Sequence, residues 1–544
     1  MKSKYYEYVL GLFLMFCFEL EIFAQNSCQP SLFLLTPSTQ NRSIEWQKFP
    51  EFSLPFSIVY GGPRFGDSQK QPLKHGFSHL ATSDGNDSDL PRNKRAAVWY
   101  GTGYPSANQP WETIKSPWGN NIELYKNKWR NDMSGFANNF SSSAETGIAD
   151  IDFFVPDIEL QIKSNDSILI LKNHPTTPLE YRSLDNQSFI NQYKKDIQVL
   201  YGQAFIETKK YVSPTTKIGG YSDAPILNTY INIAGNSWQK WTSDVSLLNY
   251  INYDFSKNAL GGTSFDNQDF YSPAAYYYYD FPSPLAPDYL AYLLFQIEVN
   301  RAWTSKPIIP FVWLRFSYTP QFVKKFIRPF MAEATAIFPF FSGAKGLWLW
   351  EDPGTFSNNE NYATYEHFIN GLYRLSQYKD MFIGNYELII QTTARDYVDT
   401  RKPIWRAVAK GNELLVAAHN AYAKDENEVV TIEVVYKNYR QNVTLKGYEV
   451  FLCKFDMTLL ANEALVTNFE VSPNPASDQI QFKVFSTKEQ QIAVEIFDVN
   501  GKKVLQEKVS LLQGENLKSL NISSLSTGVH FLRVFGRSKK IVVD

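Results

Sequence analysis

Short apolar or aromatic runs recur between Phe56 and Trp350 and alternate with longer segments of helical or loop character. This alternation favours βα units arranged around a parallel sheet. The runs assigned to strands are residues 56–62, 75–81, 149–155, 216–222, 269–281, 307–316 and 345–351. These are seven strands and a closed barrel of this type has eight, so the missing strand is expected within residues 225–256, where no clear pattern stands out. The pattern therefore predicts a (β/α)8-like TIM barrel over residues 25–395.

Two segments between the expected strands have the periodicity of amphipathic helices. In residues 187–211 and 288–304, apolar side chains recur at near-helical spacing and charged side chains occupy the other face. Both segments are predicted to be helices.

Residues 84–146 show little periodicity and are rich in Asn, Ser, Gly, Pro and Trp. Loops of this length in a compact domain are usually functional or disordered, and the many aromatic residues, Trp118 among them, argue against disorder. We predict a long loop insertion over the barrel mouth, with Trp118 as a substrate-binding candidate. An aromatic mini-core that binds no ligand is the structural alternative.

From about Lys402 the pattern changes to short strands separated by polar turns. The runs at residues 403–410, 412–420, 428–436 and 446–455 predict a small antiparallel β domain, which we place at residues 396–462. The pattern shifts again near Thr467, and residues 466–544 alternate strand-like runs with Gly, Asn and Pro turns. This last module is predicted to be an Ig-like β sandwich.

Turn motifs in residues 466–544 carry a specific resemblance. They are Pro473-Asn474-Pro475, Asp498 followed by Asn500-Gly501-Lys502, Leu525 followed by Gly528-Val529-His530-Phe531, and a basic and apolar final strand. The segment closely resembles the type A C-terminal sorting domain of the type IX secretion system, found on proteins exported by Bacteroidetes. The resemblance implies transport across the outer membrane with the secretion machinery as a partner, followed by release or attachment at the cell surface.

The first residues have the pattern of a secretory signal peptide. Two lysines precede an apolar run at residues 9–18, which is too short to span a bilayer, and cleavage is expected after Ala24. No second apolar run of about 18 residues follows, so no transmembrane segment is expected in the mature chain. Removal of the signal leaves Cys28 and Cys453, to which we assign no catalytic role and whose pairing stays open.

The charge balance argues against one class of partner. Lys and Arg number 53 against 55 Asp and Glu, a net charge of −2, so no electrostatic field favours nucleic acid or an anionic membrane. The aromatic content is high at 16%, with 33 Tyr, 40 Phe and 12 Trp. Aromatic side chains fill cores and also form the stacking walls of sugar-binding clefts, and composition does not separate the two roles.

The stretch at residues 147–160 places four carboxylates in a run of strand-forming residues. Asp150 and Asp152 alternate with apolar neighbours, whereas Asp157 and Glu159 follow a proline, where sheet pairing is expected to loosen. Asp157 and Glu159 then lie near the carboxyl end of a strand, which is the active face of a (β/α) barrel. The alternative is that these acids cap the strand and contact solvent or a neighbouring Arg.

Asp157 and Glu159 form a D-x-E pair suited to glycoside hydrolysis. Carboxyls two residues apart on one side of a strand lie roughly 7 Å apart at Cα, so we expect the charge of Asp157 to raise the pKa of Glu159. A raised pKa would suit Glu159 as the general acid that protonates the leaving oxygen of a glycosidic bond. The pair therefore predicts a glycoside hydrolase-like function with a polysaccharide or glycan substrate.

The order of elements around this pair is similar to that of hyaluronidase-type glycoside hydrolases and, more loosely, of chitinase-type barrels. It runs from the acidic strand through an amphipathic helix to the KIGGY strand and the FSGAKGLWLWE strand. In those families the Glu of D-x-E is the acid, and the Asp orients a substrate acetamido group that acts as nucleophile. The resemblance implies Glu159 as the acid, Asp157 as the orienting residue, and Tyr221 and Trp350 as cleft walls. Hyaluronidases place an aromatic residue inside the motif, where this chain has Ile158.

Further acids offer a rival arrangement. Glu351 and Asp352 close the last expected strand, and Glu351 with Glu159 could form a two-carboxylate retaining pair; alternatively, both cap the segment that follows. Asp280 is a third candidate at the mouth, assigned to substrate binding. It follows Tyr276–Tyr279, which either form a sugar platform or alternate between the core and the helix layer.

No motif for another chemistry stands out. The sequence contains no G-x-S-x-G elbow, no H-E-x-x-H and no phosphate-binding glycine loop. His75 and His79 are expected on one side of a strand without an evident third ligand, so we assign neither a metal nor a cofactor. A second class of function stays open, in which a degenerate barrel serves as a non-catalytic surface glycan-binding or structural protein. Ile158 and the lack of a second unambiguous catalytic acid favour that alternative.

Overall fold

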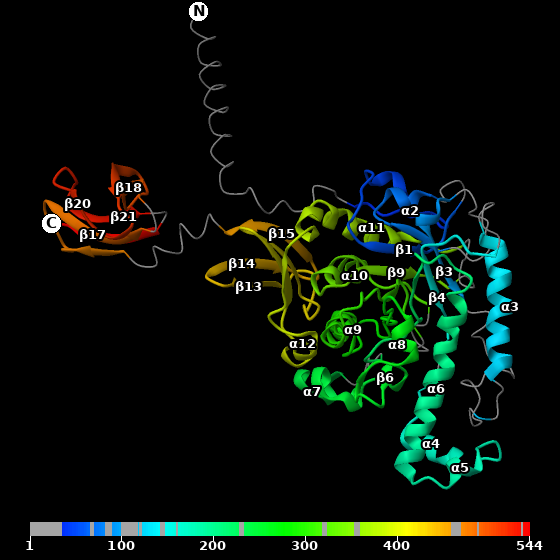
Figure 1. Cartoon of the computed structure of the whole chain (residues 1–544). Helices are drawn as coiled ribbons and strands as arrows, with labels where there is room; N and C mark the ends of the chain where they lie inside the picture. Colours follow the sequence, from blue (N-terminus) through cyan, green and yellow to red (C-terminus); the bar gives the residue numbers. More distant parts are fainter. Residues whose placement is uncertain are drawn as a thin grey trace, which may run out of the picture. The chain divides into compact units, whose positions relative to one another are not determined.

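The computed structural model describes residues 35–65, 70–81, 90–99, 118, 122–141, 147–158, 162–227, 233–317, 324–352, 359–457, 469–486, 489–534 and 537–544. Its main sheet has seven parallel strands in the order β5-β4-β3-β2-β1-β9-β8 (Figure 1). The strands are β1 (Ser57–Gly61), β2 (His79–Ala81), β3 (Arg95–Trp99), β4 (Phe153–Pro156), β5 (Lys217–Ile218), β8 (Phe311–Trp313) and β9 (Gly346–Trp350). This architecture confirms the predicted TIM-like fold.

The two edges of this sheet are joined through residues 271–277. Parallel bridges connect Ser272 to Tyr221, just beyond β5, and Ala274 to Phe311 in β8. This stretch lies within the predicted strand 269–281, where the structure has isolated bridges to both edges and no regular strand. The missing strand expected within residues 225–256 is instead β3, inside the predicted loop insertion. The one strand in the described part of 225–256 is β6 (Tyr253–Asp254), which has two residues and pairs antiparallel with β7 (Ala259–Leu260).

Strand residues divide between two environments because successive side chains point to opposite faces. Val59 of β1 and Trp348 of β9 belong to an interior apolar cluster, whereas Tyr60 and Leu349 belong to the core under the outer helices. On the other side of the barrel, Phe154 packs into a second outer core. Both faces of β1, β4 and β9 are therefore buried, which explains why these strands read as continuous apolar runs.

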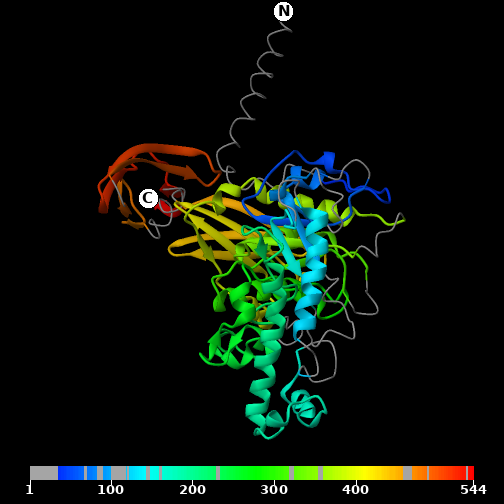
Figure 2. The same ribbon diagram turned by 45° about the vertical axis from the view of Figure 1, so that its right-hand side comes forward.

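Helices cover the outside of the sheet, and two of them are long and lie side by side. They are α3 (Ile122–Phe140) and α6 (Asn186–Thr208), which contact each other and share one core (Figures 1 and 2). The helix predicted at 187–211 is thus confirmed as α6. The prediction of a loop over 84–146 is wrong for α3, whose buried positions 125, 129, 133, 136, 137 and 140 recur at helical spacing.

The remaining helices include α9 (Tyr289–Trp303), which confirms the helix predicted at 288–304. Two more apolar helices, α10 (Pro329–Phe341) and α11 (Ala363–Ser376), pack against each other beside it. The shorter helices are α2 (Gln71–Lys74), α4 (Asn165–Ile170), α5 (Leu179–Arg182), α7 (Trp238–Ser243), α8 (Thr263–Asn267) and α12 (Ala394–Thr400).

A buried ion pair ties the helix layer to the strands that follow it. Arg406 donates from Nε and Nη2 to Glu298 Oε1 at 3.1 and 2.9 Å, and both side chains are buried. Glu298 also accepts from Ser342 Oγ and from the backbone of Ala394. Removing either charged partner would leave a buried charge uncompensated, a change that typically costs about 3–5 kcal/mol.

Four strands form the next sheet, in the order β10-β11-β12-β15. They are β10 (Glu387–Ile389), β11 (Ile404–Lys410), β12 (Glu413–His419) and β15 (Val450–Asp456), and a separate pair comprises β13 (Val429–Tyr436) and β14 (Tyr439–Lys446). Four of these six match the predicted runs; the pattern missed β10 and β14. Cys453 in β15 is fully buried and disulfide-bonded.

The C-terminal strands form two sheets, β16-β17-β20 and β19-β18-β21-β22, with antiparallel pairing. Their bounds are β16 (Glu470–Ser472), β17 (Gln479–Ser486), β18 (Gln490–Asp498), β19 (Lys503–Leu511), β20 (Gly514–Asn521), β21 (Gly528–Val534) and β22 (Arg537–Val543). Buried residues alternate with exposed ones along β17, and residues from both sheets share one core. This is the predicted β sandwich.

The chain folds as two compact units. One comprises residues through 410 with 415–430 and 445–453, and the other comprises 411–414, 431–444 and 454–544. Within the described residues, no helix combines the length and apolar character that crossing a membrane requires. The predicted signal peptide lies outside the described residues.

Deleting residues 466–544 should leave the barrel folded, because the sandwich buries its apolar side chains in a core of its own, made of residues 469–543. We expect the melting temperature of the truncated chain to stay within about 2 °C of the full-length value, measured by circular dichroism, since a shift of that size corresponds to about 2 kcal/mol for a chain of this length. A clearly lower melting temperature would show that the sandwich stabilises the barrel.

Candidate active site

Aromatic rings surround the carboxyl end of the barrel interior. The Tyr221 hydroxyl donates to the Tyr276 hydroxyl at 3.1 Å, and the Tyr276 ring meets Trp313 edge-on at 5.7 Å between centroids. Trp313 is aligned with Trp350 in the β8–β9 register. Tyr221 and Trp350 are half-buried at the edge of the interior cluster, as expected for side chains at a mouth. The two predicted wall residues thus belong to one ring layer.

Asp157 lies directly beyond β4, at the same end of the sheet. Its backbone N–H donates to the carbonyl of Trp99 at 2.9 Å, which continues the β3–β4 pairing past Pro156. Because side chains alternate along a strand, Asp157 is expected on the same face as Phe153 and Val155, which belong to the interior cluster. The Asp157 side chain is half-buried. Glu159 lies outside the described residues, so the D-x-E pair stays a prediction in which only the position of Asp157 is known.

Asp150 and Asp152 lie at the opposite, amino-terminal end of β4. Asp150 forms an ion pair with Arg92 at 3.0 Å, and Asp152 Oδ2 lies 2.9 Å from His79 Nε2. His75, by contrast, contacts the carbonyls of Gln71 and Phe49. The two histidines therefore have separate partners, and no group of three or more potential metal ligands occurs within the described ranges.

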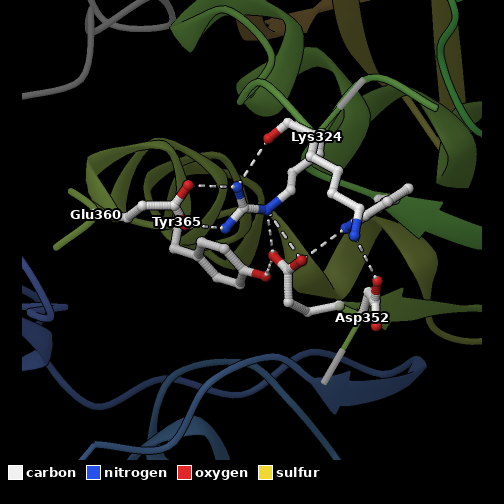
Figure 3. Close-up of polar contacts among 7 residues, drawn as sticks. Lys324, Asp352, Glu360 and Tyr365 are labelled. Carbon is white, nitrogen blue, oxygen red and sulfur yellow. Dashed lines mark hydrogen bonds and ion pairs between the residues drawn. The ribbon is translucent and has the colours of Figure 1, made fainter. Parts of the chain in front are cut away.

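Glu351 is fully buried, and both of its carboxylate oxygens accept hydrogen bonds (Figure 3). Oε1 accepts from Trp313 Nε1 at 2.9 Å and from Arg315 Nε at 3.0 Å. Oε2 accepts from the Tyr365 hydroxyl at 2.8 Å and from Arg315 Nε at 3.1 Å. The carboxylate is thus held by one cation and two neutral donors, with no exposed surface for a substrate.

Arg315 links Glu351 to a second carboxylate. Its Nη1 and Nη2 donate to the two oxygens of Glu360 at 3.2 and 2.7 Å, and Nη1 also donates to the Lys324 carbonyl at 2.8 Å. The guanidinium lies 3.8 Å from the centroid of the Phe326 ring. Burial disfavours the charge of Arg315, but the Glu360 hydrogen bonds and the Glu351 charge outweigh this effect and raise its pKa.

The other predicted site residues have structural partners. Asp280 is mostly buried and pairs with Arg328, the residue before α10, at 2.7 Å. Asp352 pairs with Lys324 at 3.3 Å (Figure 3). Trp118 packs against Tyr181, Phe189 and other rings of α5 and α6 and donates to Asp196. The binding roles proposed for Asp280 and Trp118 stay predictions.

Sequence reasoning missed a buried carboxyl beside the mouth, Asp223. It accepts from Asn252 Nδ2 at 2.7 Å, from Asn249 Nδ2 at 3.1 Å and from Gln268 Nε2 at 2.5 Å. The amide oxygens of these residues accept from Tyr271, Ile251 and Gly220, respectively, so their nitrogens must face Asp223. This arrangement leaves no oxygen cage for a cation and stabilises the turn that carries Tyr221.

A local signal for this network existed in the sequence, since Asp223 follows Gly219-Gly220-Tyr221-Ser222 at the end of a strand. Its partners come from residues 249–268, where the sequence shows no pattern that points to them. Arg315 was missed for a similar reason: it reads as one charge near the end of an apolar run, and only folding brings it to Glu351.

A comparison with known protein families identifies the C-terminal segment. Residues 470–544 match the family model of the secretion system C-terminal sorting domain. The fold and this match together define a TIM-like barrel protein with a C-terminal sorting domain. More particularly, it is a protein that the type IX secretion system exports to the cell surface or the extracellular space. No curated protein matches the sequence significantly.

Solved structures with a similar fold include several glycoside hydrolases. Bee venom hyaluronidase is 13% identical, with a TM-score of 0.38 over 58% of this chain and 99% of its own. An alpha-amylase from Anoxybacillus is 10% identical, with a TM-score of 0.33 over 76% of this chain and 99% of its own. A GH42 beta-galactosidase from G. stearothermophilus is 8% identical, with a TM-score of 0.36 over 87% of this chain and 100% of its own. All three similarities are weak.

Asp223 should contribute stability that is lost between about pH 4 and pH 6, whereas His367 and His419, whose pKa values burial lowers to about 4, contribute stability that is gained over this range. Burial raises the pKa of this carboxyl from 3.8 to about 6, so over this range the native state holds a proton that the unfolded chain has released. The contribution of Asp223 to the free energy of unfolding therefore decreases as the pH rises, by up to about 3 kcal/mol once the pH exceeds 6.

Asp223→Asn should remove this contribution to the pH dependence, although the variant loses stability at every pH because its amide faces other amide donors. The free energy of unfolding, measured in urea at pH 4, 5, 6 and 7, gives the slope for both proteins. Equal slopes would mean that Asp223 does not titrate in this range.

Proposed function

We propose that this exported protein is a glycoside hydrolase-like enzyme that binds a polysaccharide at the carboxyl end of its barrel and cleaves a glycosidic bond there. The observation that carries the proposal is the position of Asp157, directly beyond β4 and at the end of the sheet where Tyr221, Tyr276, Trp313 and Trp350 gather. In (β/α) barrels this face is the active one, built from the ends of several strands.

The ring layer suits a sugar. Aromatic side chains combine a large apolar surface with polar tips, so they can contact the C–H face of a pyranose while a hydroxyl or indole N–H binds its oxygens. The Tyr221 and Tyr276 hydroxyls, 3.1 Å apart, offer such a polar edge. Tyr221 and Trp350 retain partial exposure, which a stacking wall requires.

Asp157 and Glu159 would supply the chemistry. In the proposed reaction, Glu159 protonates the leaving oxygen as the glycosidic bond breaks. Asp157 orients the group that attacks the anomeric carbon, as the D-x-E resemblance implies, and water then completes hydrolysis. Glu351 is assigned to neither step, because it is fully buried and paired with Arg315.

Glu159→Gln should lower kcat by about 10²–10⁴-fold while leaving the fold intact, because the amide cannot donate the proton. Purified protein would be screened on polysaccharides and aryl glycosides. Asp152→Asn is the matched control: it alters an acid near the other end of β4, and its amide oxygen can still accept from His79. Full activity of Glu159→Gln would contradict the proposal.

The placement of Glu351 also favours a second candidate, a barrel that binds glycan without cleaving it. Glycan binding by Asp157→Asn/Glu159→Gln with the affinity of the parent, together with no turnover by the parent on any substrate, would favour this candidate. Loss of binding in Tyr221→Ala and Trp350→Ala would then locate the binding site at the ring layer.

Deleting residues 466–544 should leave the protein in the periplasm of its host, because the sorting domain carries the export signal. Cell fractionation with an antibody to the barrel would measure this, and a fusion of residues 466–544 to an unrelated periplasmic cargo is the reciprocal test. Normal surface delivery of the truncated chain would contradict the assignment of the signal to this segment.

A further inference from the structure

The Arg315 guanidinium is the centre of a buried network at the carboxyl ends of β8 and β9. Arg315 is 1% exposed and Glu351 is 0% exposed, so their charges are balanced within the protein rather than by water. Hydrogen bonds between charged groups in such surroundings are short and strong when both partners are fully satisfied. An assembly of this kind can hold a neighbouring side chain in one position.

The neighbouring side chain is Trp313. Its ring belongs to the interior aromatic cluster, whereas its indole N–H donates to Glu351 Oε1 at 2.9 Å. If the indole flipped, its buried N–H would lose this hydrogen bond. A buried donor without a partner typically costs about 1–3 kcal/mol, so one ring orientation is strongly favoured. Trp313 is aligned with Trp350 and touches Tyr276, so its orientation also shapes the adjoining surface.

The same guanidinium holds two chain segments at the rim. It donates to the Lys324 carbonyl and to both oxygens of Glu360, and these residues follow β8 and β9, respectively, along the chain (Figure 3). A guanidinium presents five N–H donors on three nitrogens in a fixed plane, so it can contact two carboxylates and a carbonyl in set directions; a lysine ammonium has three donors on one freely rotating nitrogen. Arg315 is therefore suited to fixing geometry.

We propose that Arg315 and Glu351 are positioning residues that fix the Trp313 indole at the barrel mouth and so set the affinity for a sugar ring. Neither residue transfers a proton to the substrate, because the carboxylate is fully buried and its oxygens are occupied by Trp313, Arg315 and Tyr365. The part concerning sugar affinity rests on the proposed function, whereas the control of the indole does not.

The control of the indole is tested by ¹⁹F NMR of the full chain labelled with 5-fluorotryptophan. Among the 12 tryptophans, the Trp313 resonance is assigned by its loss in Trp313→Phe. Arg315→Lys should shift or broaden this resonance. Arg374→Lys is the matched control, because Arg374 also binds a carboxylate, Glu333, at 2.6 Å and a backbone carbonyl, that of Val450 in β15, and none of these partners belongs to the ring layer.

Sugar affinity is tested by kinetics on a substrate that the parent protein cleaves, or by glycan binding if it cleaves none. Arg315→Lys and Glu351→Gln should raise KM, or the dissociation constant, by about tenfold and leave kcat within about twofold, since a binding surface has been disturbed and the proton donor has not. Arg374→Lys should leave both constants unchanged.

Three results would overturn the proposal. An unchanged Trp313 resonance in folded Arg315→Lys and Glu351→Gln would show that the network does not fix the indole. A loss of kcat by about 10³-fold or more in Glu351→Gln at unchanged KM would identify Glu351 as a catalytic residue. An unchanged affinity alongside a shifted resonance would show that the indole position does not affect the affinity for sugar.

A parent protein that neither binds nor cleaves glycan would contradict the proposed function, and the NMR result would still decide the role of Arg315.

Discussion

The alternation of side chains along the parallel strands is the constraint on which the rest of the structure depends. Each strand of the barrel sends one set of residues to an interior cluster and the next set to a core under the helices, so both sets must be apolar. Close approach of the strands adds a local demand: at Gly346, the first residue of β9, a Cβ atom would lie 2.0 Å from the Ser57 carbonyl oxygen. The interior set ends at the carboxyl edge in the ring layer of the candidate site.

Two carboxylates buried in this apolar framework are paired with cations. Glu351 is held by Arg315, Trp313 and Tyr365, and Glu298 is held by Arg406, so each buried carboxylate has a cation beside it. Asp223 has neutral amide donors instead, and burial accordingly raises its pKa to about 6. These differences separate the roles of the acids: the paired ones hold structure, and a carboxyl with a raised pKa makes the fold sensitive to pH.

The sorting domain buries its apolar side chains in a core of its own. Its strands alternate buried and exposed residues because only one face of each sheet meets the shared core. A module with a core of its own can be recognised by secretion machinery without involving the barrel. This independence is also why its turn motifs identified it from a short segment.

The sequence by itself determined the features that depend on neighbours along the chain: the strand runs, helices α6 and α9, the sandwich and the end of β4 that carries Asp157. It did not reveal β3, a five-residue strand within a segment of loop-like composition, or α3, whose buried stripe lies in a polar segment. Only the tertiary structure shows the partners of Glu351, because Arg315 and Tyr365 lie 36 and 14 residues away along the chain. The physical reason is that periodicity records which face of an element is buried, whereas the charge state and contacts of a buried carboxylate depend on which distant donors folding brings within hydrogen-bond reach.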